Sequence, residues 1–134
     1  MLTIRKPTEP TLTQYLADKK EWFRVSKYLK KAVNRPPYTH SLNDVYKQIL
    51  NNEAHLWAGK KSAVVTVLQE NPIGIFQTIW LAGGDLKELK KIEEEIVAVS
   101  KLANFKSIII VGRKGWIKAL DGYNDIGTLM EKKL

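Results

Sequence analysis

The spacing of apolar residues changes along the chain from helical to strand-like and back, and this order predicts the fold. In residues 12–33 apolar and aromatic side chains recur at steps of three and four, with Lys and Arg between them. This spacing predicts a helix, which Asn34 and the prolines after it end. A second helix is predicted after Ser41, with Ser41 as its N-cap and Asp44 at the third helical position of a capping box. Alternation at residues 2–5 predicts a short first strand.

The middle of the chain has the composition of a sheet. Residues 55–59, 63–68 and 73–81 are rich in β-branched and aromatic side chains and are separated by turn residues. They predict three consecutive antiparallel strands. A Gly-Gly turn is expected next, with Asp85 as the N-cap of a long helix and Glu88 at its third position. The apolar stripe of that helix consists of Leu86, Leu89, Ile92, Ile96, Val99 and Ala103.

A continuous apolar run at residues 107–112 predicts a strand that is buried on both faces and, because it follows a helix, parallel to a neighbour. A short helix from Gly115 and a final strand at residues 124–134 complete the order. The fold class is therefore α/β, with an antiparallel meander, a crossover helix and a buried parallel strand in one mixed sheet, and residues 1–134 form a single domain. The predicted core includes Trp80, Leu86, Leu89, Ile92, Ile96, Ile108, Ile110 and Trp116.

Several motifs in the second half are more specific than this order of elements. They are Leu81-Ala-Gly-Gly, Ile108-Ile-Ile-Val-Gly-Arg-Lys-Gly-Trp-Ile-Lys-Ala-Leu, Gly122-Tyr123 and a closing Leu-Met-Glu-Lys-Lys-Leu. In these motifs the chain resembles the GNAT (N-acetyltransferase) superfamily, and in particular GNAT-like proteins encoded by bacteriophages. The resemblance covers roughly residues 55–134, and the first part matches by element order alone. It implies a GNAT-like mixed sheet in which the central helix and the buried strand flank an acyl-CoA site.

Composition excludes several kinds of chemistry. The chain has no cysteine, so it has no disulfide and no thiol nucleophile, and two histidines are too few for an ordinary histidine-rich metal site. No apolar run approaches the roughly 18 residues that span a bilayer, and the first residues lack the apolar core of a secretory signal. We therefore expect no metal, no membrane and a cytoplasmic protein, located in the host cytoplasm or the virion if a phage encodes it.

The formal charge of +8 is concentrated in the first half. Residues 1–61 contain 12 Lys and Arg against 5 Asp and Glu, whereas residues 62–134 contain 10 against 9. Such a basic segment favours polyanions. No nucleic-acid recognition motif accompanies the charge, so the sequence favours solvated lysines over a nucleic-acid interface.

The resemblance places a candidate acetyl-CoA or CoA site at the start of the long helix. In active members of the superfamily, backbone N–H groups there hold the cofactor pyrophosphate, as unpaired amides at a helix N-terminus can. Here the segment reads Leu81, Ala82, Gly83, Gly84 and Asp85. The glycines are compatible with a phosphate cradle, but Asp85 brings a carboxylate to the place of the pyrophosphate. The pattern therefore favours a tight turn with an ordinary helix cap.

A second candidate anion site follows the buried strand, where Arg113 and Lys114 stand between Gly112 and Gly115. Ligands commonly bind at the carboxyl ends of strands in α/β sheets, so these cations are placed to bind a phosphate or a carboxylate. Solvated cations between two structural glycines explain the same pattern, and the sequence leaves both interpretations open.

The catalytic residues stay unknown. Residues 75–81 contain no carboxylate and no histidine, only Gln77, and Lys118 stands where the family has its acidic tyrosine. Acetyl transfer needs a base for the amine proton and an acid for the leaving thiolate. We predict that Tyr123 is a packing aromatic, that His55 lies on a strand face, and that residues 93–95, three glutamates, form a solvated helix face.

These departures favour a phage-type GNAT-like protein that is non-catalytic or weakly active and serves as a binding or structural accessory protein. The alternative is an acetyl-CoA-dependent N-acetyltransferase acting on a small amine or a protein amino group. A second alternative is a basic nucleic-acid-associated protein. The expected partners are a phage or virion protein and an acyl-CoA.

Overall fold

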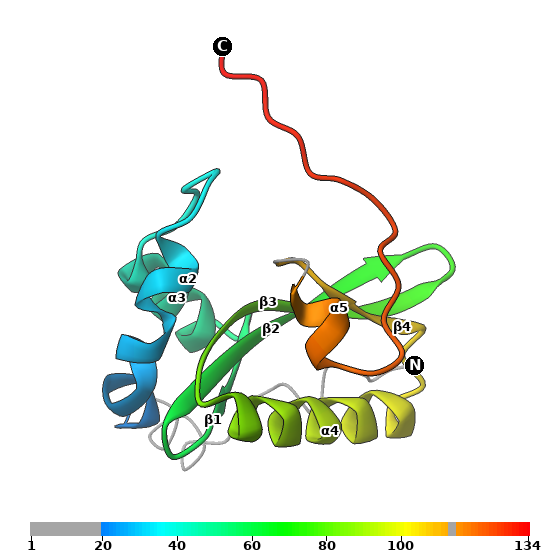
Figure 1. Ribbon diagram of the computed structural model, residues 1–134, viewed down its shortest axis with the longest axis horizontal. Coiled ribbons are helices and arrows are strands. Elements are labelled where there is room, and N and C mark those ends of the chain that lie inside the picture. Colours follow the sequence, from blue (N-terminus) through cyan, green and yellow to red (C-terminus); the bar gives the residue numbers. More distant parts are fainter. Residues whose placement is uncertain (1–19, 113–114) are drawn as a thin grey trace.

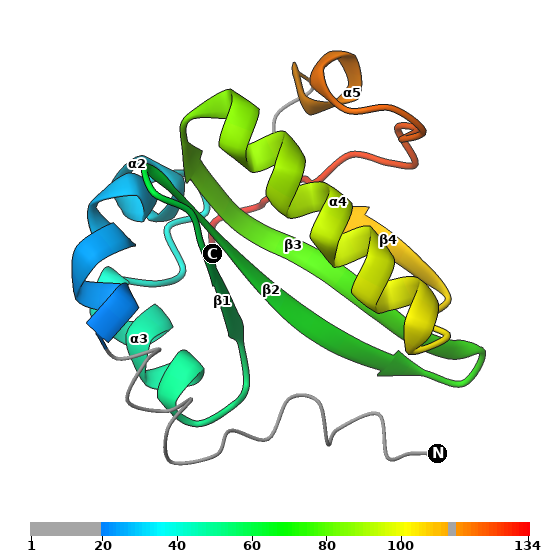
Figure 2. The same ribbon diagram turned by 90° about the horizontal axis from the view of Figure 1, so that it is seen from below.

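A four-stranded mixed sheet organises the molecule, as seen in a computed structural model that describes residues 20–112 and 115–134 (Figures 1 and 2). Its strands, in the order in which they pair, are β1 (His55–Ala58), β2 (Ser62–Asn71), β3 (Gly74–Gly84) and β4 (Ser107–Ile110). The first three form an antiparallel meander, and β3 and β4 are parallel. The predicted mixed α/β sheet is confirmed. The predicted strand at residues 2–5 and the first part of the helix at residues 12–33 lie outside the described residues.

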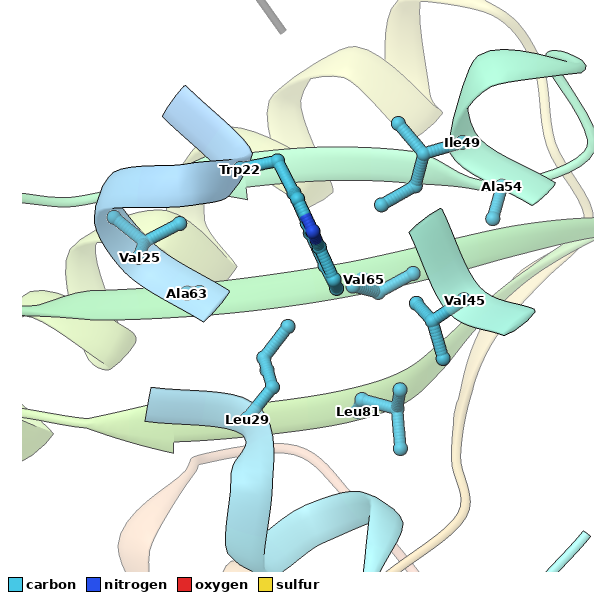
Figure 3. Close-up of a cluster of buried hydrophobic side chains, with 9 residues drawn as sticks. All are labelled: Trp22, Val25, Leu29, Val45, Ile49, Ala54, Ala63, Val65 and Leu81. Carbon is cyan, nitrogen blue, oxygen red and sulfur yellow. The ribbon is translucent and has the colours of Figure 1, made fainter. Parts of the chain in front are cut away.

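Helices from the first half cover one face of the sheet. Residues 20–25 are α-helical, followed by a 3₁₀ turn, η2 (Ser26–Leu29), and then by α2 (Lys30–Val33) and α3 (Leu42–Leu50). The continuous helix predicted up to residue 33 is therefore wrong in its middle, where the 3₁₀ turn tightens the chain and leaves Leu29 fully buried. The apolar cluster beneath these helices is drawn in Figure 3 and consists of Trp22, Val25, Leu29, Val45, Ile49, Ala54, Ala63, Val65 and Leu81.

The predicted capping box of α3 is confirmed. The Ser41 hydroxyl accepts a hydrogen bond from the Asp44 amide at 3.1 Å, and the Ser41 amide donates to the Asp44 carboxylate at 2.9 Å. Both bonds satisfy amides that the first turn of a helix leaves unpaired. The Ser41 amide, together with the Ser41 hydroxyl, which also donates to the Asp44 carboxylate at 2.9 Å, favours the ionised carboxylate and so lowers the pKa of Asp44.

The long helix α4 (Leu86–Leu102) crosses the other face of the sheet (Figure 2). Leu89, Ile92 and Ile96 are buried against β2 and β3, as predicted. The prediction that Leu86 is buried is wrong. Leu86 is the first residue of α4, and 48% of its surface is exposed. Val99 is 39% exposed, so the buried stripe is narrower than the sequence indicates.

Strand β4 is less enclosed than its sequence suggests. Ile108 and Ile110 are half-buried and Val111 is 50% exposed, because β4 is the edge strand of the described sheet. The strand predicted at residues 124–134 is absent from the described structure, where this segment is exposed and without regular structure. Ile126, Met130 and Leu134 would share one face of a strand, but the segment pairs with no described strand that could hold it. Trp80 is also only half-buried, and the side chain of Trp116 lies outside the described residues.

Two leucines of α4 test which helix face stabilises the fold. Leu89 is 6% exposed and Leu102 is 87% exposed, so the same truncation removes buried contacts at one site and solvated ones at the other. Leu89→Ala should lower the free energy of unfolding by about 2–5 kcal/mol. Leu102→Ala should change it by less than about 0.5 kcal/mol. Urea denaturation of both variants measures the two values, and equal losses would show that α4 is packed differently.

Candidate functional site

The candidate site is a cavity of about 1000 Å³ at the point where β3 and β4 part. The parallel ladder between them ends where the Val111 amide donates to the Ile79 carbonyl at 3.2 Å. β3 continues to Gly84 and pairs there with β2 alone among the described strands. The cavity is lined by the continuing strand (Trp80, Leu81, Ala82), by β4 and the residues after it (Ile108, Ile109, Ile110, Val111, Gly112), and by Leu89, Glu93 and Ile96 of α4.

A β-bulge at Trp80 shapes the wall that β3 contributes. Val65 of β2 lies opposite Leu81 and the next residue, Thr66, lies opposite Ile79, so Trp80 is one extra residue in β3. Such a residue interrupts the alternation of a strand between the two faces of a sheet. Ile79 accordingly packs under α4, whereas Trp80 and Leu81 both pack on the opposite face.

A histidine ring packs against the bulge on the face of the sheet that the helices of the first half cover. His40, in the loop between α2 and α3, places its ring edge-on to the Trp80 ring with centroids 4.7 Å apart. Its Nδ1 lies 2.8 Å from the Thr39 hydroxyl and its Nε2 lies 3.2 Å from the Gln48 amide nitrogen. His40 and Arg35 both line the cavity, so this wall carries basic groups.

The opposite wall carries an acid–base pair. The Tyr123 hydroxyl donates to the Glu93 carboxylate at 2.8 Å, and both residues line the cavity. Burial raises the pKa of Tyr123 far above its usual value of 10, and the hydrogen bond to Glu93 raises it further, since a neighbouring negative charge disfavours tyrosinate. The hydroxyl therefore stays protonated over the physiological range.

The start of α4 differs from an open anion site. The Asp85 carboxylate accepts the Lys87 amide at 2.8 Å and the Glu88 amide at 3.4 Å, so Asp85 is the N-cap, as predicted. The two glycines do not form the predicted turn, because β3 runs through both of them. A Cβ on Gly83 would collide with the Tyr28 carbonyl, and one on Gly84 with the Lys61 carbonyl. Close backbone packing is therefore sufficient to explain both glycines.

Glu88 and Arg24 hold the turn between β1 and β2 against this helix end. One Glu88 oxygen accepts the Lys61 amide at 2.8 Å and the Ser62 hydroxyl at 2.6 Å. The hydroxyl bond is the main reason that the pKa of Glu88 is lowered, and the amide adds to it. Arg24 donates to the carbonyls of Gly59 at 2.8 Å and Lys60 at 2.9 Å. The side chain of Glu88 therefore does not complete a capping box with Asp85.

The predicted site residues separate in the structure. Leu81 and Ala82 line the cavity, whereas Gly83, Gly84 and Asp85 are not among its lining residues. Arg113 and Lys114 lie outside the described residues. The cofactor assignment of the whole set stays a prediction.

Comparison with known proteins identifies a shared fold. No protein-family model matches the sequence, and no curated protein matches it. Two structures of TTHA1254 from Thermus thermophilus, a wild type and a single-substitution mutant, superpose with TM-scores of 0.56 and 0.58. Their sequences are 10% and 9% identical to this one, and each match covers 87% of this chain and 92% of the other. This chain shares the fold of TTHA1254. At such low identity the likeness concerns the fold alone.

The sequence interpretation missed three contributors to the cavity. Glu93 was assigned to a solvated face with its two neighbours, but it is half-buried and bonded to Tyr123. The helical period contained the signal, because Glu93 follows the buried Ile92 and precedes Ile96 by three positions. His40 and the bulge at Trp80 were not singled out. His55, by contrast, lies in β1 as predicted.

The described residues were also compared with the expectations of no metal site and no membrane-spanning segment. Within residues 20–112 and 115–134 no three His, Asp or Glu side chains lie close enough together to hold a metal ion. No helix in that part of the chain has the length and apolar character needed to cross a bilayer. The basic residues of the first half are mostly exposed lysines, and Arg24 is already paired with Glu21 at 2.6 Å.

Gly83→Ala tests whether this glycine serves backbone packing. The added methyl group meets the Tyr28 carbonyl, a backbone atom that cannot rotate away, so we expect a loss of about 1–3 kcal/mol in unfolding free energy. Gly127→Ala is the matched control, because a Cβ there has no described atom within 4 Å. Denaturant titration compares the two variants, and an unchanged Gly83→Ala protein would remove the packing explanation.

His55 predicts a dependence of stability on pH. Burial lowers its pKa below the usual 6.5, so between the two pKa values the unfolded chain binds more protons than the folded one. Stability should therefore fall as the pH is lowered from about 7.5 to about 5.5. Asp44 and Glu88 stay ionised over this range because their pKa values are lowered.

In His55→Gln the loss of stability that His55 causes on lowering the pH should disappear. His40→Gln retains His55 and should still show this loss. Urea midpoints at the two pH values give the slopes. Equal slopes in the unmodified protein and His55→Gln would contradict the assignment.

Proposed function

We propose that this chain is a GNAT-like protein of the phage type that binds an acyl-CoA or similar elongated ligand in the cavity between β3 and β4 and carries out little or no acetyl transfer. It acts as a binding or structural accessory protein. Two parallel strands that part around a cavity, with a helix across one face, support the GNAT-like part of the proposal. The cavity is large enough for a ligand of drug size.

The main observation in favour of low activity is that the amides at the α4 N-terminus are already hydrogen-bonded. A pyrophosphate would need free amides there, and the Asp85 carboxylate already accepts those of Lys87 and Glu88. The same carboxylate would repel the phosphates. The N-terminus of α4 is therefore a poor binding site for the pyrophosphate of CoA.

The acid–base pair in the cavity gives a second reason. A leaving thiolate has a pKa near that of cysteine, about 8.5. Because burial and Glu93 raise the pKa of Tyr123 far above that value, transfer of its proton to a thiolate is unfavourable. Tyr123 lines the cavity, where a general acid would be needed, but its raised pKa makes it a weak proton donor.

The second candidate function is an acetyl-CoA-dependent N-acetyltransferase acting on a small amine or a protein amino group. Tyr123, Glu93 and His40 favour it, because they bring one proton donor and two proton acceptors to a single cavity. In this case Tyr123 would protonate the leaving group and His40 would accept the amine proton. Tyr123→Phe would then abolish turnover without destroying CoA binding.

Calorimetric titration with CoA and a turnover assay with acetyl-CoA and a panel of amines test the proposal. We expect weak CoA binding and no turnover by the unmodified protein. Asp85→Asn keeps an acceptor for the helix amides but removes the charge, and should tighten CoA binding roughly 3- to 10-fold. Glu94→Gln, on the exposed side of the same helix, makes the same change in net charge and should leave the affinity unchanged.

Tight CoA binding by the unmodified protein, together with turnover that Tyr123→Phe abolishes, would overturn the proposal in favour of the enzyme. No gain in affinity in Asp85→Asn would show that the geometry of the strand end, and not the charge, excludes the pyrophosphate.

A further inference from the structure

The loop between α2 and α3 brings an unbalanced positive charge to the cavity. Arg35, in this loop, lines the cavity and is half-buried. Its guanidinium makes no hydrogen bond and no ion pair with any residue in 20–112 or 115–134, whereas Arg24 is bonded to Glu21 and to two carbonyls. A guanidinium is always charged and presents its N–H donors in a rigid fork. Arg35 is therefore a cation that is partly withdrawn from water and can still bind an anion.

The backbone of the loop fixes the base of the Arg35 side chain. The Tyr38 amide donates to the Arg35 carbonyl at 2.8 Å, which closes a turn over Pro36 and Pro37. The proline rings hold φ at both positions. Tyr38 itself has a φ of 58°, in a region that residues other than glycine seldom occupy and that is enriched at ligand sites. The loop is thus shaped before a ligand arrives, which lowers the entropy cost of binding.

The groups beside Arg35 supply a further hydrogen-bond donor. The amide nitrogen of Gln48 can only donate, so the His40 Nε2 atom, 3.2 Å away, accepts, and the neutral ring carries its hydrogen on Nδ1. Nδ1 donates that hydrogen to the Thr39 hydroxyl at 2.8 Å. Thr39 lines the cavity and keeps its own hydroxyl hydrogen for a ligand. His40 would have to leave Gln48 before it could accept an amine proton.

Trp80 adds an apolar surface to the same wall. Its ring is half-buried and lines the cavity, and its indole N–H has no hydrogen-bond partner in the described part of the chain. Ala32 and Val33 of α2 also line the cavity, and they pack on the same face of the sheet as Trp80. A ligand here would meet donors at one end and an apolar surface at the other.

The charge of this wall favours a carboxylate over a phosphate. The carboxylates that line the cavity are engaged elsewhere, since Glu93 accepts the Tyr123 hydroxyl at 2.8 Å and Asp125 accepts the Gly127 amide at 3.2 Å. One guanidinium with neutral donors balances one negative charge. A carboxylate carries one such charge, whereas a phosphate monoester carries about 1.5 to 2 near pH 7.

We propose that this wall binds a small organic acid, with its carboxylate on the Arg35 guanidinium and the Thr39 hydroxyl and its apolar body against Trp80. Guanidinium and carboxylate pair through two parallel hydrogen bonds, which gives the contact direction as well as strength. The proposal goes beyond the proposed function, because binding of a small acid requires neither CoA binding nor acetyl transfer.

Backbone amide shifts of a ¹⁵N-labelled sample test the class of ligand. The sample is titrated separately with benzoate, phenylacetate and hexanoate, without CoA. At least one of these acids should shift the amides of Thr39, His40 and Trp80 in a saturable way. The neutral amide of the best-binding acid should bind at least about 10-fold more weakly, because it loses a hydrogen bond between charged groups. Phenyl phosphate should bind no more tightly than the acid.

Three variants test the role of Arg35 with the same acid. Arg35→Gln should weaken binding at least about 10-fold. Arg35→Lys keeps the charge but not the fork, so its affinity should lie between those of the unmodified protein and Arg35→Gln. Lys31→Gln removes the same charge from an exposed position of α2 that does not line the cavity, and should leave the affinity unchanged. Amide spectra of the free variants report whether each one is folded.

Equal affinity for the acid and its amide, unchanged binding in Arg35→Gln and Arg35→Lys, tighter binding of phenyl phosphate, or no shift with any of the acids at millimolar concentration would each overturn the proposal. Because no CoA is present, failure of this titration is separate from failure of the CoA titration that tests the proposed function.

Discussion

The architecture of this protein depends on one extra residue in β3, Trp80. Without the bulge, Ile79 and Leu81 would face the same side of the sheet, as alternate residues in a regular strand do. With it, Ile79 packs under α4 and Leu81 packs under the helices of the first half, so one strand supplies both cores. The ladder to β4 stops at the same level, and the cavity lies where the two strands part.

A second constraint fixes the far end of β3. The turn between β1 and β2 is held by Arg24 from one layer and by Glu88 from the other, and the Lys61 carbonyl accepts the Asp85 amide at 3.0 Å. Both glycines fit into this crowded junction because neither has a side chain. The helix that begins there is capped by its own Asp85. The segment to which the family resemblance assigns a pyrophosphate therefore joins β3, α4 and the turn between β1 and β2.

Periodicity was sufficient to predict the meander, the parallel β3–β4 pair and the capping of α3 and α4, because each depends on local spacing. It was not sufficient for the bulge, since residues 73–81 are almost all apolar and show no alternation that an extra residue could break. Glu93 was missed because three adjacent glutamates look uniformly solvated, although only one of them faces the cavity. The strand expected at residues 124–134 is wrong, because the segment pairs with no strand in the described part of the chain, although β4 is an edge strand there.

The central claim is that ligand binding uses the cavity between β3 and β4 and leaves the α4 N-terminus unused. Backbone amide shifts in a ¹⁵N-labelled sample titrated with CoA measure this directly. The amides of Trp80, Leu81 and Ala82, together with those of Ile110 and Val111, should shift, while those of Lys87 and Glu88 stay bonded to Asp85 and unchanged. Shifts centred on Lys87 and Glu88, or no shift anywhere at millimolar CoA, would contradict the claim.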